Sequence, residues 1–289
     1  MKKYLSLVKF AHTIFALPFA MLGLFLGLQV MEINAWEPDK PAWQSFLLVI
    51  LCMVFARNAA MGFNRYIDRD IDADNARTQT REIPAGIISP RHALGFVLAN
   101  VGLFILTTWF INPLCFYLSP VALAVILGYS LTKRFTALCH LVLGVGLSLA
   151  PVGAFIAVTG VFQWEPIILG LAVLTWVSGF DIIYALQDEE FDKGHALYSI
   201  PAWLGKNRAL MVSSALHFVT ASFILLFGVL IQASWIYWIG AICFLVLLGY
   251  QHFLVKPHDL SRVNLAFFTT NGIASVIFAC FGIGELLLR

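Results

Sequence analysis

Nine apolar segments, each long enough to cross a bilayer as a helix, divide this chain of 289 residues. A spanning helix needs about 20 predominantly apolar residues. Hydrophobic residues make up 60% of the sequence and charged ones 12%, whereas a soluble domain carries about 25% charged residues. We therefore expect an all-α, polytopic membrane protein with nine transmembrane helices in a bundle. The expected helices are residues 9–31, 43–72, 92–111, 114–132, 138–160, 164–191, 209–231, 234–254 and 264–287.

The basic residues are unequally divided between the two sides that nine spans create. The N-terminus and the even-numbered connections carry almost all of them, and the opposite side carries only Lys40 and Arg289. Because cytoplasmic connections are enriched in Lys and Arg, this predicts a cytoplasmic N-terminus and an external C-terminus, in a bacterial inner membrane. The net charge of +2 offers no broad basic surface for nucleic acid, and no obligate protein partner is evident.

Two acidic patterns close apolar helices on the cytoplasmic side. In the first, Asn64, Asp68 and Asp72 recur every four residues, so a helix would place them on one face. In the second, Asp188 and Asp192 repeat that spacing at the end of the sixth helix. Equivalent positions on the second and sixth helices predict a parallel internal repeat of about four helices. The chain would form a single domain, 1–289, with halves near 1–135 and 136–289.

Carboxylates crowded near a membrane are costly unless a partner compensates their charge. Mg²⁺ prefers oxygen ligands and commonly takes one or two carboxylates together with substrate phosphate oxygens. The pattern therefore predicts a Mg²⁺ site and a phosphorylated substrate, with basic loop residues binding the phosphate rather than neutralising the carboxylates. The candidate metal ligands are Asn64, Asp68, Asp72, Asp188 and Asp192. The candidate phosphate ligands are Arg77, Arg81, Lys133, Arg134 and Lys193.

Polar residues also continue both faces deeper into the membrane. Arg57 lies seven residues before Asn64, and Asp181 lies seven before Asp188, with Tyr184 between them. Ionisable groups at such depth usually serve a function. Arg57 is therefore expected to reach the substrate phosphate or to pair with Asp181 across a cavity, and Tyr184 is a further substrate-binding candidate.

The sequence also offers weaker candidate residues and two alternative explanations of the acidic patterns. Lys9 and His12 begin the first helix and are weaker substrate-binding candidates, because His12 fits an interfacial residue equally well. His140 has no partner in the sequence and is expected to be structural. The acidic patterns also fit helix ends that only fix topology, or an ion-coupled transporter. A transporter, however, is expected to bind near the bilayer midplane, often between inverted repeats.

At the two acidic motifs the chain closely resembles the UbiA superfamily of intramembrane aromatic prenyltransferases. The family patterns NDxxDxxxD and YxxxDxxxD appear here as Asn64-Arg65-Tyr66-Ile67-Asp68 to Asp72 and as Tyr184 to Asp188 to Asp192. Arg65 stands where many members have Asp. The resemblance extends over essentially the whole chain. With the segments KFAHTIFALPF and DIIYALQD, it is closest to 4-hydroxybenzoate polyprenyltransferase-like members, including those of the futalosine route to menaquinone.

The resemblance implies a Mg²⁺-dependent transfer of a polyprenyl group from a prenyl diphosphate to an aromatic acid in ubiquinone or menaquinone biosynthesis. The acceptor would be 4-hydroxybenzoate or a hydroxynaphthoate, with homogentisate or haem as alternatives. The prenyl tail would lie among membrane lipid and the diphosphate at the cytoplasmic face. Asp68, Asp72, Asp188 and Asp192 would act in catalysis through the metal, and Asp181 or one of these four would accept the proton that the acceptor loses.

Overall fold

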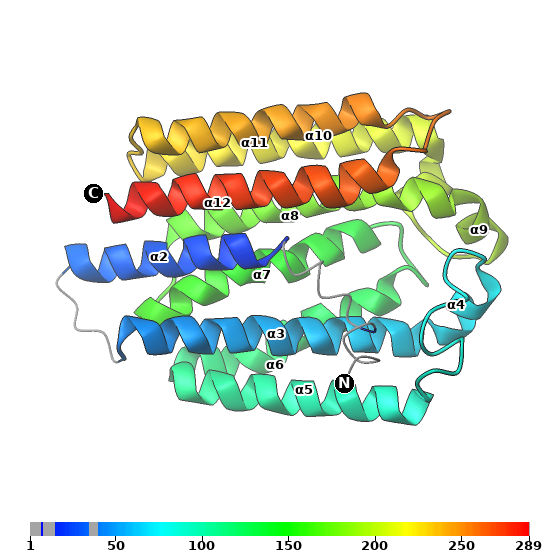
Figure 1. Ribbon diagram of the computed structural model, residues 1–289, viewed down its shortest axis with the longest axis horizontal. Coiled ribbons are helices and arrows are strands. Elements are labelled where there is room, and N and C mark those ends of the chain that lie inside the picture. Colours follow the sequence, from blue (N-terminus) through cyan, green and yellow to red (C-terminus); the bar gives the residue numbers. More distant parts are fainter. Residues whose placement is uncertain (1–6, 8–14, 35–39, 289) are drawn as a thin grey trace.

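Helices form nearly all of the regular structure in the computed structural model of the protein, which describes Leu7 and residues 15–34 and 40–288 (Figure 1). Within these residues, eight helices are long and apolar enough to cross a membrane, and Leu17–Ile33 is a shorter apolar helix. The predicted all-α bundle is thus confirmed. The elements are α2 (Leu17–Ile33), α3 (Ala42–Ile67), α4 (Arg69–Asp74), α5 (Pro90–Ile111), α6 (Pro113–Thr132), α7 (Cys139–Thr159), α8 (Trp164–Ala185), the 3₁₀ turn η2 (Leu186–Asp188), α9 (Glu189–Gly194), α10 (Ile200–Leu230), α11 (Trp235–Leu254), the π-helix η3 (Leu265–Thr270) and α12 (Asn271–Leu287).

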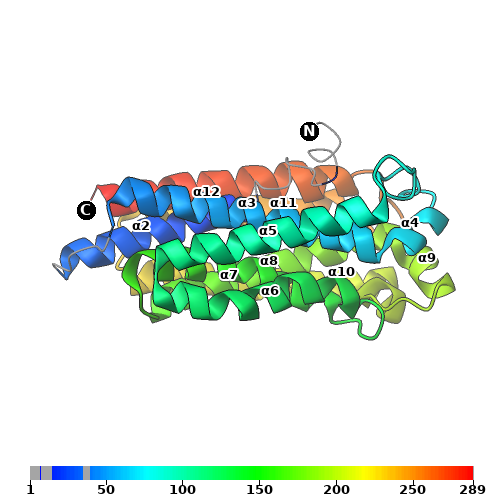
Figure 2. The ribbon, with the colours of Figure 1, turned by 90° about the horizontal axis from the view of Figure 1, so that it is seen from below.

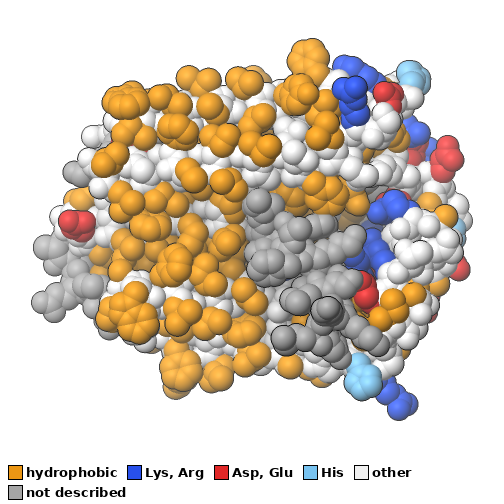
Figure 3. All heavy atoms as spheres, viewed as in Figure 1, with side chains coloured by type: hydrophobic (Ala, Val, Ile, Leu, Met, Phe, Trp, Pro, Cys, Tyr) orange, Lys and Arg blue, Asp and Glu red, His pale blue; other side chains and the backbone are white. Residues whose placement is uncertain are grey.

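The surface separates into an apolar body and a charged end. In Figure 3, hydrophobic side chains cover most of the visible face, and nearly all charged side chains gather at the end where α4 and α9 lie. Large apolar side chains along the helices are widely exposed, among them Trp109, Phe218 and Phe253. Soluble monomers rarely expose such extensive apolar surface, whereas a bilayer covers it. The protein is therefore an integral membrane protein.

Helix α8 is the most buried span and packs between α7 and α10. Its Trp176 is fully buried, with the Phe19 ring centred 5.2 Å and the Phe244 ring 5.7 Å from the indole. The Trp176 Nε1 donates a 3.0 Å hydrogen bond to Asn271 Oδ1 of α12. Buried aromatic pairs with a satisfied indole N–H contribute strongly to packing. This core fixes α8, and with it the acidic residues at its polar end.

Both acidic segments interrupt helices that the sequence predicts to be continuous. Helix α3 ends at Ile67, and Asp68, with φ −91° and ψ 5°, joins it to the short α4. Helix α8 likewise ends at Ala185 and passes through η2 into α9. Aspartate favours helix ends over helix interiors, because its side chain competes for local backbone hydrogen bonds. The predicted spans 43–72 and 164–191 are therefore each two helices, and Figures 1 and 2 place α4 and α9 at the same end of the bundle.

Helix α10 begins at Ile200, nine residues before the predicted start at 209. The Ser199 side chain caps it by accepting a hydrogen bond from Ala202 N, and Pro201 occupies its first turn, which are strong signals of a helix start. Gly205, with φ 77° and ψ 164°, then kinks the chain before the long span. The connection after α9 is consequently much shorter than the one predicted between residues 191 and 209.

Candidate active site

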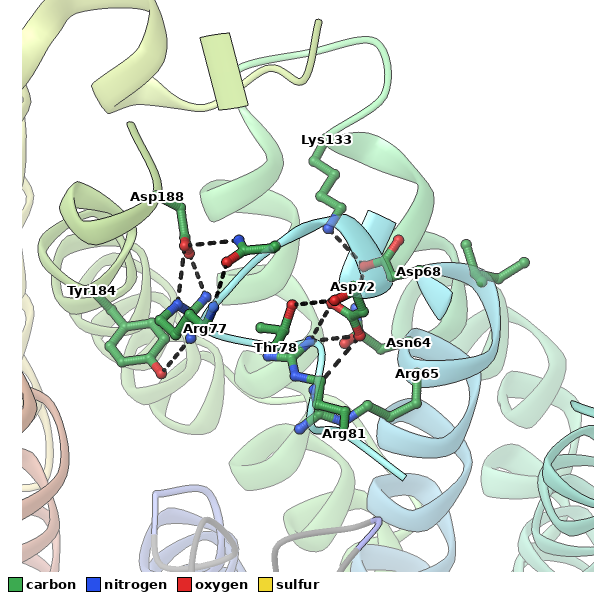
Figure 4. Close-up of polar contacts among 12 residues, drawn as sticks. Asn64, Arg65, Asp68, Asp72, Arg77, Thr78, Arg81, Lys133, Tyr184 and Asp188 are labelled. Atoms are coloured by element: carbon green, nitrogen blue, oxygen red, sulfur yellow. Dashed lines mark hydrogen bonds and ion pairs between the residues drawn. The ribbon is translucent and has the colours of Figure 1, made fainter. Parts of the chain in front are cut away.

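Asp68 is buried at the junction of α3 and α4 and faces Lys133, which follows α6 (Figure 4), as well as the neighbouring Arg134. Lys133 Nζ lies 2.7 Å from Asp68 Oδ2, and Arg134 Nη2 donates a 2.9 Å hydrogen bond to Oδ1. Asn64 Nδ2 donates to Oδ2 at 3.2 Å. Arg134 also donates to the backbone oxygen of Ile67 at 3.0 Å, a carbonyl in the last turn of α3. These contacts join the end of α6 to the end of α3.

Asp72 is buried one turn further on, in α4, and is held by the loop that follows. Arg81 Nη1 donates to both carboxylate oxygens, at 2.6 and 2.8 Å. Arg65 Nη1 lies 4.0 Å from Oδ2 on the α3 side. The Thr78 hydroxyl donates a 3.1 Å hydrogen bond to the backbone oxygen of Asp72. The loop therefore folds back over its own helix (Figure 4).

Arg77 of the same loop reaches the second acidic segment. Its Nε donates to Asp188 Oδ1 at 3.0 Å, its Nη2 donates to Oδ2, and its Nη1 donates to the Tyr184 hydroxyl at 3.2 Å. Asn75 Nδ2 also donates to Asp188 Oδ1, at 3.3 Å. Burial by itself lowers the pKa of Arg77, but the hydrogen bonds and charge of Asp188 outweigh it and raise the pKa above the ordinary arginine value. One loop thus joins the two acidic segments through a permanent cation (Figure 4).

The remaining carboxylate of the second segment has a different environment. Asp192 accepts a 2.8 Å hydrogen bond from the hydroxyl of Ser199, the cap of α10. Lys193, predicted to bind phosphate, instead lies 2.6 Å from Glu189 Oε1, and Lys206 lies 3.9 Å from the other oxygen. The Lys193–Glu189 pair therefore lies within α9, because the two residues are one helical turn apart.

Deeper in the bundle, Asp181 pairs with a histidine. His140 Nδ1 of α7 lies 2.7 Å from Asp181 Oδ2, and His140 Nε2 accepts a hydrogen bond from Ile200 N at 3.3 Å. The structure thus gives His140 a partner that the sequence alone does not indicate. Its partner lies 41 residues away in the sequence and meets it only because α7 packs on α8.

A cavity of about 390 Å³ begins one helical turn from the first acidic cluster. Residues of α3, α5, α6 and α7 line it, including Met61 and Tyr129 near the charged end and Ile111 near the opposite end of the bundle. The lining is almost entirely apolar, and among the described residues that form it Arg57 alone carries a charge. The cavity suits a long apolar ligand with an anionic part near Arg57.

The cations pair directly with the carboxylates that the sequence predicts as metal ligands. Each of Arg77, Arg81, Lys133 and Arg134 lies on one of these carboxylates, and their role as phosphate ligands stays a prediction. Across the described ranges, no three His, Cys, Asp or Glu side chains lie close enough together to hold a metal ion. The donor set itself, carboxylates and an amide oxygen, is of the kind that Mg²⁺ prefers. Metal binding would therefore require the carboxylates to exchange their cationic partners.

The family model of the UbiA prenyltransferase family matches residues 30–273. The chain belongs to this family. A 4-hydroxybenzoate octaprenyltransferase from Tolumonas auensis is 31% identical over 236 residues, which cover 81% of this chain and 82% of that protein. The apo structure of a UbiA homologue from Aeropyrum pernix K1 has a TM-score of 0.79 at 28% identity and covers 96% of this chain and 97% of its own.

A UbiA homologue from Archaeoglobus fulgidus, solved with GPP and Mg²⁺ bound, has a TM-score of 0.76 at 21% identity, with 99% of each chain covered. At that identity the likeness concerns the UbiA fold alone. The membership confirms the resemblance seen at the two motifs and makes this protein a UbiA-family prenyltransferase.

In this UbiA-family protein, the predicted site residues fall into three groups. Six meet around the first segment: Asn64, Asp68, Asp72, Arg81, Lys133 and Arg134. Three meet at the second: Arg77, Tyr184 and Asp188. Four others have the separate surroundings given above: Arg57, Asp181, Asp192 and Lys193. The remaining two, Lys9 and His12, lie outside the described residues.

Sequence reasoning missed several residues that contact these groups: Arg65, Asn75, Thr78, His140, Ser199 and Lys206. Only Ser199 had a usable signal, because a serine two residues before a proline is a common helix start. The others act through tertiary contacts that no local pattern predicts.

Proposed function

We propose that this prenyltransferase moves a polyprenyl group from a prenyl diphosphate to an aromatic acid, 4-hydroxybenzoate or a hydroxynaphthoate, in quinone biosynthesis. One observation carries the proposal: an apolar cavity starts beside a cluster of carboxylates and cations at the charged end of the bundle. A prenyl diphosphate has the same division into a charged head and an apolar tail. The relative from Tolumonas auensis, named a 4-hydroxybenzoate octaprenyltransferase, supports the acceptor.

The charged end would bind the diphosphate through an exchange of partners. Asp68, Asp72, Asp188, Asp192 and Asn64 would hold Mg²⁺, and the GPP and Mg²⁺ in the Archaeoglobus fulgidus neighbour support this choice. When bound, the metal neutralises negative charge on the diphosphate and so favours its departure. Arg77, Arg81, Lys133 and Arg134 then turn from the carboxylates to the diphosphate oxygens, for which guanidinium and ammonium groups are well suited.

The acceptor would lie between Arg57 and Asp181. A guanidinium in an apolar wall binds a carboxylate strongly, so Arg57 holds the acid group of the ring. The bond between the prenyl carbon and the diphosphate oxygen breaks, a bond between that carbon and a ring carbon forms, and the ring carbon loses its proton. Asp181 accepts this proton, since it lies on the face of α8 that continues to Tyr184 and Asp188.

The experiment is product analysis by mass spectrometry with the purified protein in lipid. It receives geranyl or a longer prenyl diphosphate with either 4-hydroxybenzoate or 1,4-dihydroxy-6-naphthoate, each with Mg²⁺ or with EDTA. A prenylated acid that forms only with Mg²⁺ supports the proposal and names the acceptor. If neither acid is prenylated, homogentisate and haem are tested next. Failure of all four, together with no binding of the diphosphate, would contradict prenyl transfer and favour a transporter.

A further inference from the structure

His140 lies between Asp181 and the backbone N–H of Ile200, the first residue of α10, and its two ring nitrogens have opposite roles. The Ile200 N–H points at Nε2 from 3.3 Å. A backbone N–H can only donate, so Nε2 must be the accepting, unprotonated nitrogen. The proton of the neutral ring therefore lies on Nδ1, which donates to Asp181 Oδ2 at 2.7 Å. In a doubly protonated ring, Nε2–H would point at the Ile200 N–H, so that two donors would face each other with no acceptor between them.

This arrangement fixes the orientation of Asp181. One carboxylate oxygen is held by the ring, while the side chain stays 23% exposed against 3% for that of His140. The backbone of His140 is also tied to α8, because Ser178 Oγ donates to the His140 backbone oxygen at 3.1 Å. Helices α7 and α8 also approach so closely at Gly144 that a Cβ there would lie 2.4 Å from the Leu174 oxygen.

We propose that His140 is a positioning residue that orients Asp181, so that its second oxygen accepts the proton lost by the aromatic ring. This inference rests on the proposed function for the role of Asp181. His140 does not itself touch the substrate; it acts through the carboxylate, in the way that a buried partner orients a general base.

The first test separates kcat from KM in two variants. His140→Ala should lower kcat about 10- to 100-fold, because a misplaced base loses much of its effect. The KM for the aromatic acid should change less than about 3-fold, since the lost interaction matters in the transition state. His140→Asn, whose side-chain amide puts a donor near the position of Nδ1, should restore most of kcat. A kcat within about 2-fold of wild type in His140→Ala, or no recovery in His140→Asn, would overturn the proposal.

The second test asks whether His140 acts through Asp181. In a double-mutant cycle, adding His140→Ala to Asp181→Asn should cause no further loss of kcat, because the base is already gone. Multiplying losses would mean that the two residues act independently. His217→Ala is the matched control: His217 is as buried as His140, but it bonds to His252 and to the Trp176 backbone. Its kcat should stay within about 3-fold of wild type.

A third measurement does not depend on turnover. Ring ¹⁵N and ¹³C NMR shifts of histidine-labelled protein, assigned by the loss of one signal in His140→Asn, report which nitrogen is protonated. A neutral ring with the proton on Nδ1 supports the inference, and a proton on Nε2 or a doubly protonated ring overturns it. If the wild-type protein forms no prenylated product, the proposed function fails. The NMR measurement then still tests, independently of turnover, whether the His140 ring donates from Nδ1 to Asp181.

Discussion

Each buried carboxylate of the first acidic segment is balanced by cations of the same chain. Asp68 lies between Lys133 and Arg134, and Asp72 accepts two hydrogen bonds from Arg81. Removing one member of a buried ion pair leaves an uncompensated charge, which can cost about 3–5 kcal/mol. The same pairs keep the cations oriented toward the position where we propose that the diphosphate binds. Individual charges at this end therefore contribute to stability and, in our proposal, also to substrate binding.

Asp188→Asn should lower prenyl transfer by at least about 100-fold, because it removes a proposed metal ligand and the anion that orients Arg77. Helical content and insertion into the membrane should be unchanged, since the apolar spans are intact. The measurement is the initial rate of product formation at saturating Mg²⁺, with circular dichroism of the same sample.

Asp70→Asn is the matched control for this change. Like Asp188→Asn, it removes one carboxylate charge, in this case from α4. The Asp70 side chain is 84% exposed, and Arg69 Nη2 lies 3.5 Å from Asp70 Oδ2 in a surface pair. Surface pairs contribute at most about 1 kcal/mol, so activity should stay within about 2-fold of wild type. Equal losses in both variants would contradict a specific role for Asp188.

At the scale of elements, the first turn of α10 is a separate unit between α9 and the long span. Ser199 caps it and bonds to Asp192, Ile200 bonds to His140, and Gly205 turns the chain into the membrane. Tyr198 N donates to the Lys133 backbone oxygen at 2.7 Å, which joins this turn to the segment after α6. The short turn thus connects both acidic segments to the deeper Asp181.

Gly205→Ala should destabilise the protein by about 1–3 kcal/mol, because φ 77° with ψ 164° is a conformation essentially restricted to glycine. A lower apparent melting temperature in detergent would show this. In contrast, Gly249→Ala on α11 has open space for a Cβ and a helical backbone, so its melting temperature should be unchanged or slightly higher. A Gly205→Ala protein as stable as wild type would mean that the kink is not required.

The cavity predicts a variant that discriminates between prenyl chain lengths. Gly153 of α7 lines the cavity, and a side chain added there meets open space. Gly153→Phe should fill part of this volume and lower kcat/KM for long prenyl diphosphates by about 10-fold or more, while leaving the shortest donor within about 3-fold. Competition between a short and a long donor measures the ratio directly. Gly249→Phe, outside the cavity lining, should not change it.

For the molecule as a whole, the sequence was sufficient to predict the spans and the polar end, because hydropathy and charge are summed over local segments. The pairs Arg77–Asp188 and His140–Asp181 were not predicted, since their members are 111 and 41 residues apart and meet only through helix packing. The helix breaks at Asp68 and Ala185 were missed for a related reason: four-residue spacing looks helical even where tertiary contacts turn the chain. The internal repeat stays a prediction.

The orientation in the membrane is testable by cysteine labelling in a variant without the five native cysteines. Gln79→Cys, in the exposed loop after α4, should react with an impermeant maleimide only in inverted vesicles, because the basic loops are predicted to be cytoplasmic. Gln232→Cys, exposed between α10 and α11, should react only in intact cells. The reverse pattern would place the charged end on the outside.

The separation of a charged end from an apolar cavity also determines where the two products of the proposed reaction go. Diphosphate, released at the charged end, is soluble only in water, whereas the prenylated acid is soluble mainly in the bilayer. The products therefore enter different phases as soon as they leave the protein, and the reverse reaction requires that they meet again at its surface. In the proposed reaction, the two products would therefore rarely meet again at the protein, because each stays in its own phase.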